Sequence, residues 1–447
     1  MNTHIGSTLL GFVAMAIMVA RAPPAAAASP GSIQPYGIVS RTAAPAYLNM
    51  PHLADGKIPL LLSQTGAFRD TRNLVPAAGL IPYDLVVPFW SDGASKLRLA
   101  AIPQGKIKNS PTGDWIFPNG TVFVKTFELP IDAANPSLKH RLETRLLVRD
   151  RAGGVYGVVY KWRPDESDAD LLPSSLTEQI HGQTWYYPSR PDCLACHNAK
   201  TSGVLGVKAR QLNRTFTYPS GVTDNELRTW NHLGLFANPI NDADLGNILT
   251  LAAADDAARS LQDRARSYLD ANCSHCHRPG GTVAYFDARY DTPLEKQELI
   301  DGPVLIDQGI DRPRVVSPHD IWRSIAFMRI NTLEDIKMPP LARETIDQKG
   351  VKLLQDWITS LPGRPVLDPP AMSPQGGTFG VPVEVSLTVR EPGADIRYTL
   401  DGSVPGPSDM RYDKPIKLTE PAVLRARAFK DGFTRSITSQ EVFIVGK

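Results

Sequence analysis

The sequence predicts a multidomain α+β protein, with an N-terminal antiparallel β domain, two small α-helical regions in the middle and a small C-terminal β-sandwich. Three observations lead to this fold class. Alternating apolar and polar runs with Gly-rich turns occupy both ends of the chain. Two Cys-x-x-Cys-His motifs, at 193–197 and 273–277, stand beside segments with helical periodicity. The length of 447 residues indicates about three domains.

Residues 1–28 have the pattern of a secretory signal peptide. Leu9 to Ala20 form an apolar stretch that is short for a membrane span, and Ala26-Ala27-Ala28 offer small residues for cleavage. No later segment is long and apolar enough to cross a bilayer. We expect a bacterial protein in the periplasm or secreted, without a transmembrane span after cleavage.

The composition is that of an ordinary globular protein. Hydrophobic residues make up 42% and charged residues 21%, and the formal net charge is +2. This balance gives no electrostatic basis for a nucleic-acid partner.

The N-terminal β domain is expected over residues 36–180. Residues 121–129 alternate like a half-buried strand, and 155–162 look like the hairpin partner of 141–148 across Gly153-Gly154. An Asn119-Gly120 pair provides another hairpin-type turn.

The two α-helical regions are expected over 181–240 and 241–363, one around each Cys-x-x-Cys-His motif. In the first, Thr223 and Glu226 have the spacing of a capping box that starts a helix ending near Gly234. In the second, residues 256–272 have helical periodicity and run directly into the motif, and a helix over 347–361 closes the region.

The two motifs use all four cysteines of the chain, and each has the pattern of a c-type haem attachment site. Two thiols separated by two residues can form thioethers with the vinyl groups of one haem, and the adjacent histidine then binds the iron from one side. We therefore expect two covalently attached haem c groups. The thioether cysteines would be Cys193, Cys196, Cys273 and Cys276, and the proximal iron ligands would be His197 and His277.

Two other uses of the cysteines stay open. Cys-x-x-Cys pairs can form redox disulfides, which does not explain why histidine follows both pairs. Four thiolates can hold one zinc ion, but the pairs of a zinc ribbon usually lie about 15–20 residues apart, much closer than these motifs.

The second face of each iron requires its own ligand. Met338 is the candidate for the second haem, because a Met-Pro pair precedes the closing helix and thioether ligation suits electron transfer. For the first haem the best candidate is His232. The alternative is an open or water-bound position, where a small molecule such as peroxide or oxygen could bind.

Several segments resemble known cytochromes. Residues 315–319 (VVSPH), 338–341 (MPPL) and 357–358 (WI) resemble the class I-like cytochrome c domains of secreted bacterial proteins. Residues 88–94 (PFWSDGA), 117–121 (FPNGT), 143–146 (ETRL) and 188–190 (PSR) resemble a family of uncharacterised bacterial diheme c-type cytochromes, often encoded near parallel β-helix proteins. That resemblance covers about 75–363 and implies no assigned reaction.

A Pro-rich linker over 364–375 leads to a β-rich tail over 376–447. Residues 397–405 and 424–429 of the tail resemble the C-terminal β-sandwich of chitobiase and hexosaminidase enzymes. Such modules are accessory, which implies contact with polysaccharide or cell envelope, or a spacer.

The function we expect is one-electron transfer in the periplasm, with a dehydrogenase, oxidase or peroxidase as redox partner. One alternative is a peroxidase- or oxidase-like diheme enzyme with an open first haem. Another is an electron-transfer adaptor bound to glycan or envelope.

Overall fold

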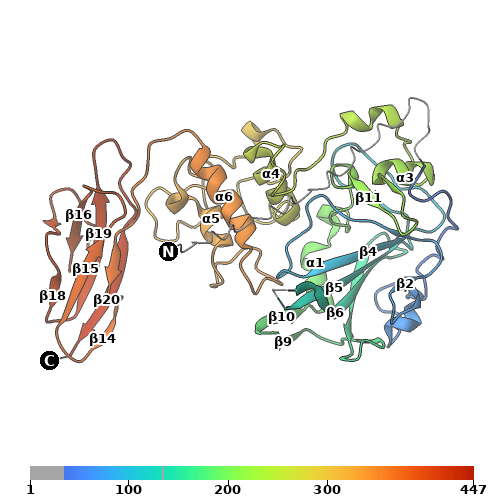
Figure 1. Cartoon of the computed structure of the whole chain (residues 1–447), viewed down its shortest axis with the longest axis horizontal. Coiled ribbons are helices and arrows are strands. Elements are labelled where there is room, and N and C mark those ends of the chain that lie inside the picture. The colour runs from blue at the N-terminus through green and yellow to red at the C-terminus, as the bar shows by residue number, and fades with distance from the viewer. Residues whose placement is uncertain (1–34, 133–134, 447) are drawn as a thin grey trace, which may run out of the picture. The chain divides into compact units, whose positions relative to one another are not determined.

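The structure is a computed structural model that describes residues 35–132 and 135–446. It divides into two units, Met1–Pro35 and Tyr36–Lys447, and all that follows concerns the second. The predicted signal peptide at 1–28 lies outside the described residues. Within the described part, 20 strands and six α-helices are present (Figure 1), and no helix there is long and apolar enough to cross a bilayer.

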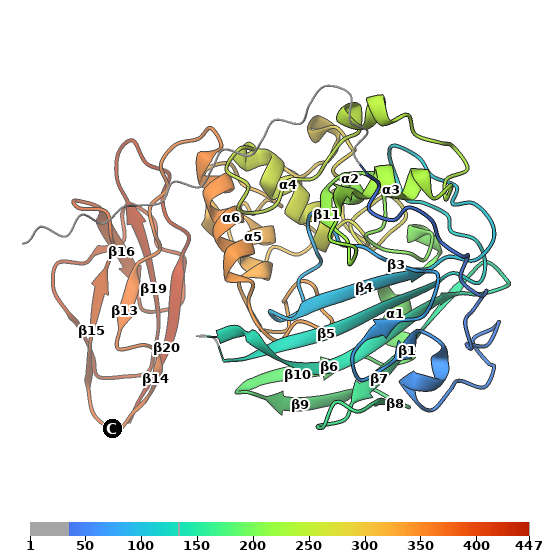
Figure 2. The same ribbon diagram turned by 45° about the vertical axis from the view of Figure 1, so that its right-hand side comes forward.

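The largest sheet has six antiparallel strands in the order β3-β4-β5-β6-β7-β8 (Figure 2). The alternation over 121–129 and 155–162 corresponds to β5 and β7, and Gly153 turns with a φ of 85° between β6 and β7. The strands are Leu80–Pro82, Ser95–Ala101, Val122–Asp132, Asn135–Arg149, Val155–Trp162 and Ala169–Leu171.

Both faces of this sheet are covered. Because side chains alternate along a strand, Val124 contributes to one core and its neighbour Phe123 to the other. The Val124 side packs against residues 44–80, which include the short pair β1 (Phe68–Asp70) and β2 (Val75–Pro76). The Phe123 side packs against residues 204–236 and is the side on which the first Cys-x-x-Cys-His motif lies.

The predicted fold class is wrong, because the two motif regions are not small helical domains and the chain is mostly β. In 181–240 the helices are only four to seven residues long, and α1 packs on strand β7 rather than on a partner helix. Hairpins fill much of the remainder. The elements are β9 (Leu176–Ile180), β10 (Gln183–Tyr187), α1 (Arg190–Cys196), α2 (Ala209–Leu212), β11 (Thr215–Thr217), β12 (Thr223–Asn225) and α3 (Glu226–His232).

The predicted cap at Thr223 is also wrong. Thr223 lies in strand β12, and its hydroxyl bonds to Thr217 across the hairpin. Asn225 caps α3 instead, because its side chain accepts the backbone N–H of Arg228 at 3.2 Å.

The second motif region contains three helices connected by long irregular segments. These are α4 (Leu261–Asn272), α5 (Ile325–Ile330) and α6 (Gln348–Ser360). Tyr268 of α4 and Trp357 of α6 share one core, as the apolar periodicity indicated, and Gly350 permits the close approach. A Cβ at Gly350 would lie 2.4 Å from the Tyr268 ring.

The C-terminal segment forms the predicted small β-sandwich around one apolar core. One sheet has the order β13-β15-β18 and the other β14-β20-β19-β16-β17 (Figure 1). The strands are Ala371–Ser373, Gly377–Phe379, Val383–Thr388, Asp395–Thr399, Met410–Arg411, Ile416–Leu418, Ala422–Phe429 and Ser439–Val445.

Candidate cofactor site

Helix α1 carries the first motif and begins at a well-formed cap. Ser189 accepts the backbone N–H of Asp192, and the Asp192 carboxylate accepts the Ser189 N–H at 2.8 Å. The Tyr186 hydroxyl donates to the same carboxylate at 2.6 Å. The Pro-Ser-Arg segment before the motif therefore fixes where the helix that bears Cys193 and Cys196 starts.

Cys193 lies directly against the central sheet at a glycine. A Cβ added at Gly157 of β7 would stand 2.7 Å from the Cys193 Sγ and 2.8 Å from its Cβ. Any side chain at position 157 would therefore push the first motif away from the sheet.

His197 ends α1 with one ring nitrogen already engaged. Its Nδ1 lies 2.9 Å from the carbonyl oxygen of Gly203, so an Nδ1–H donated there leaves Nε2 as the free lone pair. Burial and the charge of Lys125 lower the pKa of His197 to about 3, which keeps the imidazole neutral at pH 7. A backbone-anchored neutral imidazole has the form that binds metal ions.

Helix α4 ends directly before the second motif and places it next to the first. The backbone N–H of Cys273 donates to Leu269 at 2.8 Å, and the N–H of His277 donates to Cys273 at 2.9 Å, so the helical turn continues through the motif. Ser274 and His275, between the two cysteines, are buried.

The two motifs meet through one cysteine from each. The side chains of Cys196 and Cys276 lie close enough to shift each other's pKa in opposite directions, although 80 positions separate them in the sequence. This proximity raises the pKa of Cys196, together with burial, and it lowers the pKa of Cys276, together with the neighbouring His275. All four cysteines are free thiols in the structure.

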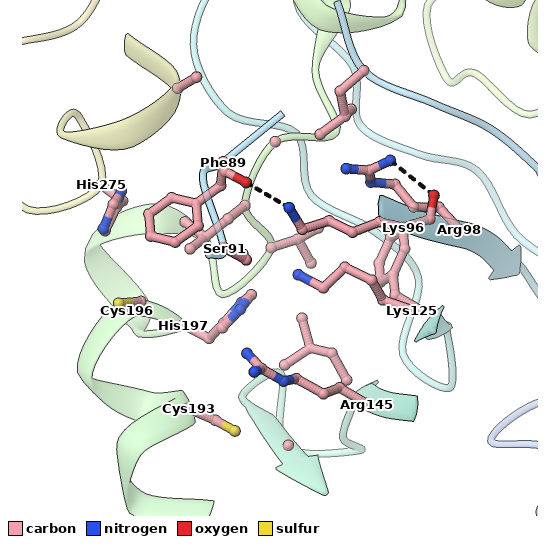
Figure 3. Close-up of a pocket in the computed structure, with 18 of the residues that line it drawn as sticks. Phe89, Ser91, Lys96, Arg98, Lys125, Arg145, Cys193, Cys196, His197 and His275 are labelled. Atoms are coloured by element: carbon pink, nitrogen blue, oxygen red, sulfur yellow. Dashed lines mark hydrogen bonds between the residues drawn. The ribbon is translucent and has the colours of Figure 1, made fainter. Parts of the chain in front are cut away.

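A pocket opens beside this contact, lined by parts of both motifs and by the central sheet. Figure 3 shows His197, His275 and Phe89 together with four cationic side chains from neighbouring strands, one of which is Arg98. The other three cations are Lys96, Lys125 and Arg145. The edge of the Phe89 ring contacts His275, with ring centroids 5.6 Å apart.

His277 lies outside the pocket lining and stacks on Phe286, with ring centroids 4.3 Å apart. Its Nδ1 is buried and has no hydrogen-bond partner among the described residues. Burial lowers the pKa of His277 to about 4, with the charge of Arg329 adding to the effect. Arg329 also accepts the backbone N–H of Met338 at 2.9 Å, which ties the Met338 segment to the surroundings of His277.

His232 does not come together with His197. Its ring stacks on Tyr36 with centroids 3.6 Å apart, and its Nε2 bonds to the carbonyl oxygen of Val39 at 2.8 Å. It does not line the pocket that contains His197.

The 88–94 segment lies beside the second motif and contacts the segments on both sides of it in the sequence. The backbone N–H of Trp90 donates to the side-chain oxygen of Asn272, the residue before Cys273, at 2.8 Å. Asp92 accepts the backbone N–H groups of Glu344 and Thr345 at 2.9 and 2.8 Å, which anchors the segment after Met338. These contacts explain the Phe-Trp-Ser-Asp-Gly sequence as a positioning element.

A buried ionic network connects α2, which follows the first motif, with α4, which leads into the second. Arg210 of α2 makes a two-pronged pair with Asp270 of α4 at 2.7 and 3.1 Å, and their side chains are 2% and 0% exposed. Lys208 approaches Asp270 at 3.6 Å. Burial alone would raise the pKa of Asp270, but Lys208 and Arg210 outweigh it and bring the pKa to about 2.

Sequence reasoning missed the pocket residues contributed by the sheet. Lys125 and Arg145 stand at apolar-alternation positions where a core side chain was expected, and a charged residue there is the signal that could have identified them. Gly157, in the middle of a strand, carried a second signal of close approach. His275 lines the pocket because of tertiary contacts, such as its contact with Phe89, that no local sequence pattern encodes.

The described residues contain no group of three or more His, Cys, Asp or Glu side chains placed to hold a metal ion.

Comparison with known proteins adds one match. Residues 374–440 match the chitobiase/β-hexosaminidase C-terminal domain family, which accounts for the C-terminal sandwich alone. No curated protein matches the chain, and no solved structure matches it.

Proposed function

We propose that the chain is an exported diheme c-type cytochrome that transfers single electrons in the bacterial periplasm. The observation that carries this proposal is the meeting of two complete Cys-x-x-Cys-His motifs at Cys196 and Cys276. A covalently bound haem iron supplies reversible one-electron oxidation and reduction. Two such groups attached at neighbouring thiols would have adjacent edges, and a short separation favours electron transfer between them.

The residues around the first motif fit a haem. His197 keeps Nε2 free because Nδ1 is held by Gly203. Gly157 leaves room for the Cys193 side of the attachment, and Phe89 offers an apolar edge within the pocket. His197 would be the proximal ligand, with Cys193 and Cys196 as thioethers.

The second motif fits in a different way. Cys273 is partly buried, and burial raises its pKa to about 12. The buried Nδ1 of His277 has no described partner, so this ring is held by stacking on Phe286 rather than by a hydrogen bond. Met338 would be the distal ligand, carried by the segment that Arg329 and Asp92 anchor.

A second candidate function is that of a peroxidase- or oxidase-like diheme enzyme. The observation that favours it is the lining of the first pocket, which includes no methionine among the described residues and presents lysine and arginine opposite His197. Binding of carbon monoxide to one reduced haem would favour this candidate. Two reduced haems that do not bind carbon monoxide would favour the electron-transfer function.

The C-terminal sandwich would place the protein at polysaccharide or cell envelope, with a periplasmic dehydrogenase, oxidase or peroxidase as redox partner. The family match over 374–440 supports such contact. Retention on insoluble glycan by the full chain, lost when residues 364–447 are removed, is the expected result.

Intact mass of the protein, produced with a c-type maturation system, tests the proposal. The full chain should gain the mass of two haems. Changing both cysteines of one motif to serine, in C193S/C196S or C273S/C276S, should leave one haem each. A chain that matures without any haem would overturn the proposal, and a mass corresponding to a Cys196–Cys276 disulfide would favour the thiol-redox alternative.

A further inference from the structure

Three cationic side chains lie next to one another on adjacent strands of the central sheet. Arg98 of β4 is the direct cross-strand partner of Lys125 of β5, and Lys125 is in turn the direct partner of Arg145 of β6. Directly opposed residues share a face of the sheet, so the three side chains form one row. Like charges in this arrangement destabilise a sheet, and the row therefore requires an explanation.

The chain itself neutralises only part of the row. Arg98 pairs with Asp84, and Arg145 makes a two-pronged pair with the buried Glu143. Within the described part of the chain, no carboxylate lies within ion-pair distance of Lys125. Asp84 also pairs with Arg214, and Lys96, which lines the same pocket, has no ion-pair partner among the described residues either, so positive charge exceeds negative charge around the row.

The row faces a cavity rather than bulk water. All three side chains line the pocket that contains His197, and Lys125 points into it (Figure 3). Burial, reinforced by Arg145 and Arg98, lowers the pKa of Lys125 to about 7. Lys125 therefore stands between the guanidinium groups of Arg98 and Arg145 without a carboxylate partner among the described residues.

We propose that Arg98, Lys125 and Arg145 form a binding site for a carboxylate group beside His197. Guanidinium and ammonium groups bind carboxylates through charge-assisted hydrogen bonds, and the excess positive charge of the pocket favours an anion there. Two sources have this chemistry: a propionate of the first haem, which rests on the proposed function, and the carboxylate of a small organic acid that enters the pocket.

The test compares Lys125→Met with Lys108→Met, which removes the same charge at an exposed position outside the pocket. Lys125→Arg serves as the conservative variant. Haem number is read from intact mass, midpoint potentials from redox titration, and acid binding from calorimetry with succinate as the probe and succinamide as its neutral analogue.

A propionate source predicts that Lys125→Met lowers the midpoint potential of one haem, because a lost cation favours the oxidised iron. Lys125→Arg and Lys108→Met should retain the potential, and succinate should not bind. A small-acid source predicts succinate binding that weakens about tenfold in Lys125→Met, with unchanged potentials.

The inference is overturned if Lys125→Met matches Lys108→Met in both midpoint potentials and succinate binding. If mass shows no haem at all, the proposed function fails, and succinate binding alone then decides the inference. Loss of succinate binding in Lys125→Met would support the carboxylate site in that case, and absence of binding to the unchanged protein would overturn it.

Discussion

Asp270→Asn is expected to lower the free energy of unfolding by about 3 kcal/mol, because it breaks a buried ion pair and leaves Asp291, at 3.1 Å, as the remaining carboxylate partner of Arg210. Asp270 also accepts the backbone N–H of Tyr290 at 3.0 Å, so the change weakens the start of the segment after the second motif. Urea denaturation of the full chain measures the effect.

The effect of Asp270→Asn should depend on pH. The folded-state pKa of Asp270, about 2, lies below the value of about 3.9 expected for an unfolded aspartate. A depressed carboxyl pKa stabilises the protein above the unfolded value, and this stability is lost as pH falls from about 4 towards 2. The difference between the two proteins should therefore shrink across that window.

The matched control is Asp170→Asn, which breaks the exposed ion pair between Asp170 of β8 and Arg163. Those side chains are 54% and 41% exposed, so the loss should stay below about 1 kcal/mol. Equal losses for the two variants would show that the Arg210–Asp270 network does not hold the motifs together.

Gly157→Val is expected to prevent attachment at the first motif while leaving the second intact. The new Cβ would lie 2.7 Å from the Cys193 Sγ, where no side chain fits unless α1 moves off the sheet. Overpacking of this kind costs about 1–3 kcal/mol in a well-packed site. Intact mass should show one haem in most of the protein.

Valine suits a strand, so loss of strand propensity does not account for the expected effect. Gly377→Val is the control, because Gly377 is also a strand glycine and its Cβ would meet only Phe379, at 3.8 Å. Two haems in Gly157→Val would contradict the placement of Cys193 against β7.

Local patterns predicted the elements that local forces determine. Alternation identified β5 and β7, and apolar periodicity identified α4 and α6 with the shared core of Tyr268 and Trp357. Those patterns could not show that α1 packs on a sheet, so the two motif regions were wrongly expected to be helical domains. Thr223 has a capping sequence, but pairing with Thr217 across a hairpin overrode it.

The site depends on register and on contacts between distant segments. Nothing in the spacing of the cysteines shows that Cys196 and Cys276 meet, or that Arg98, Lys125 and Arg145 stand opposite one another. His232 was chosen because it is near the first motif in sequence, and it stacks on Tyr36 instead.

Circular dichroism in the Soret region tests most directly whether the two motifs hold a coupled pair of haems. The oxidised two-haem protein should give a couplet of opposite-signed bands that is absent from both C193S/C196S and C273S/C276S. A spectrum equal to the sum of the two single-haem variants would contradict the account, because haems attached at touching cysteines cannot be independent chromophores.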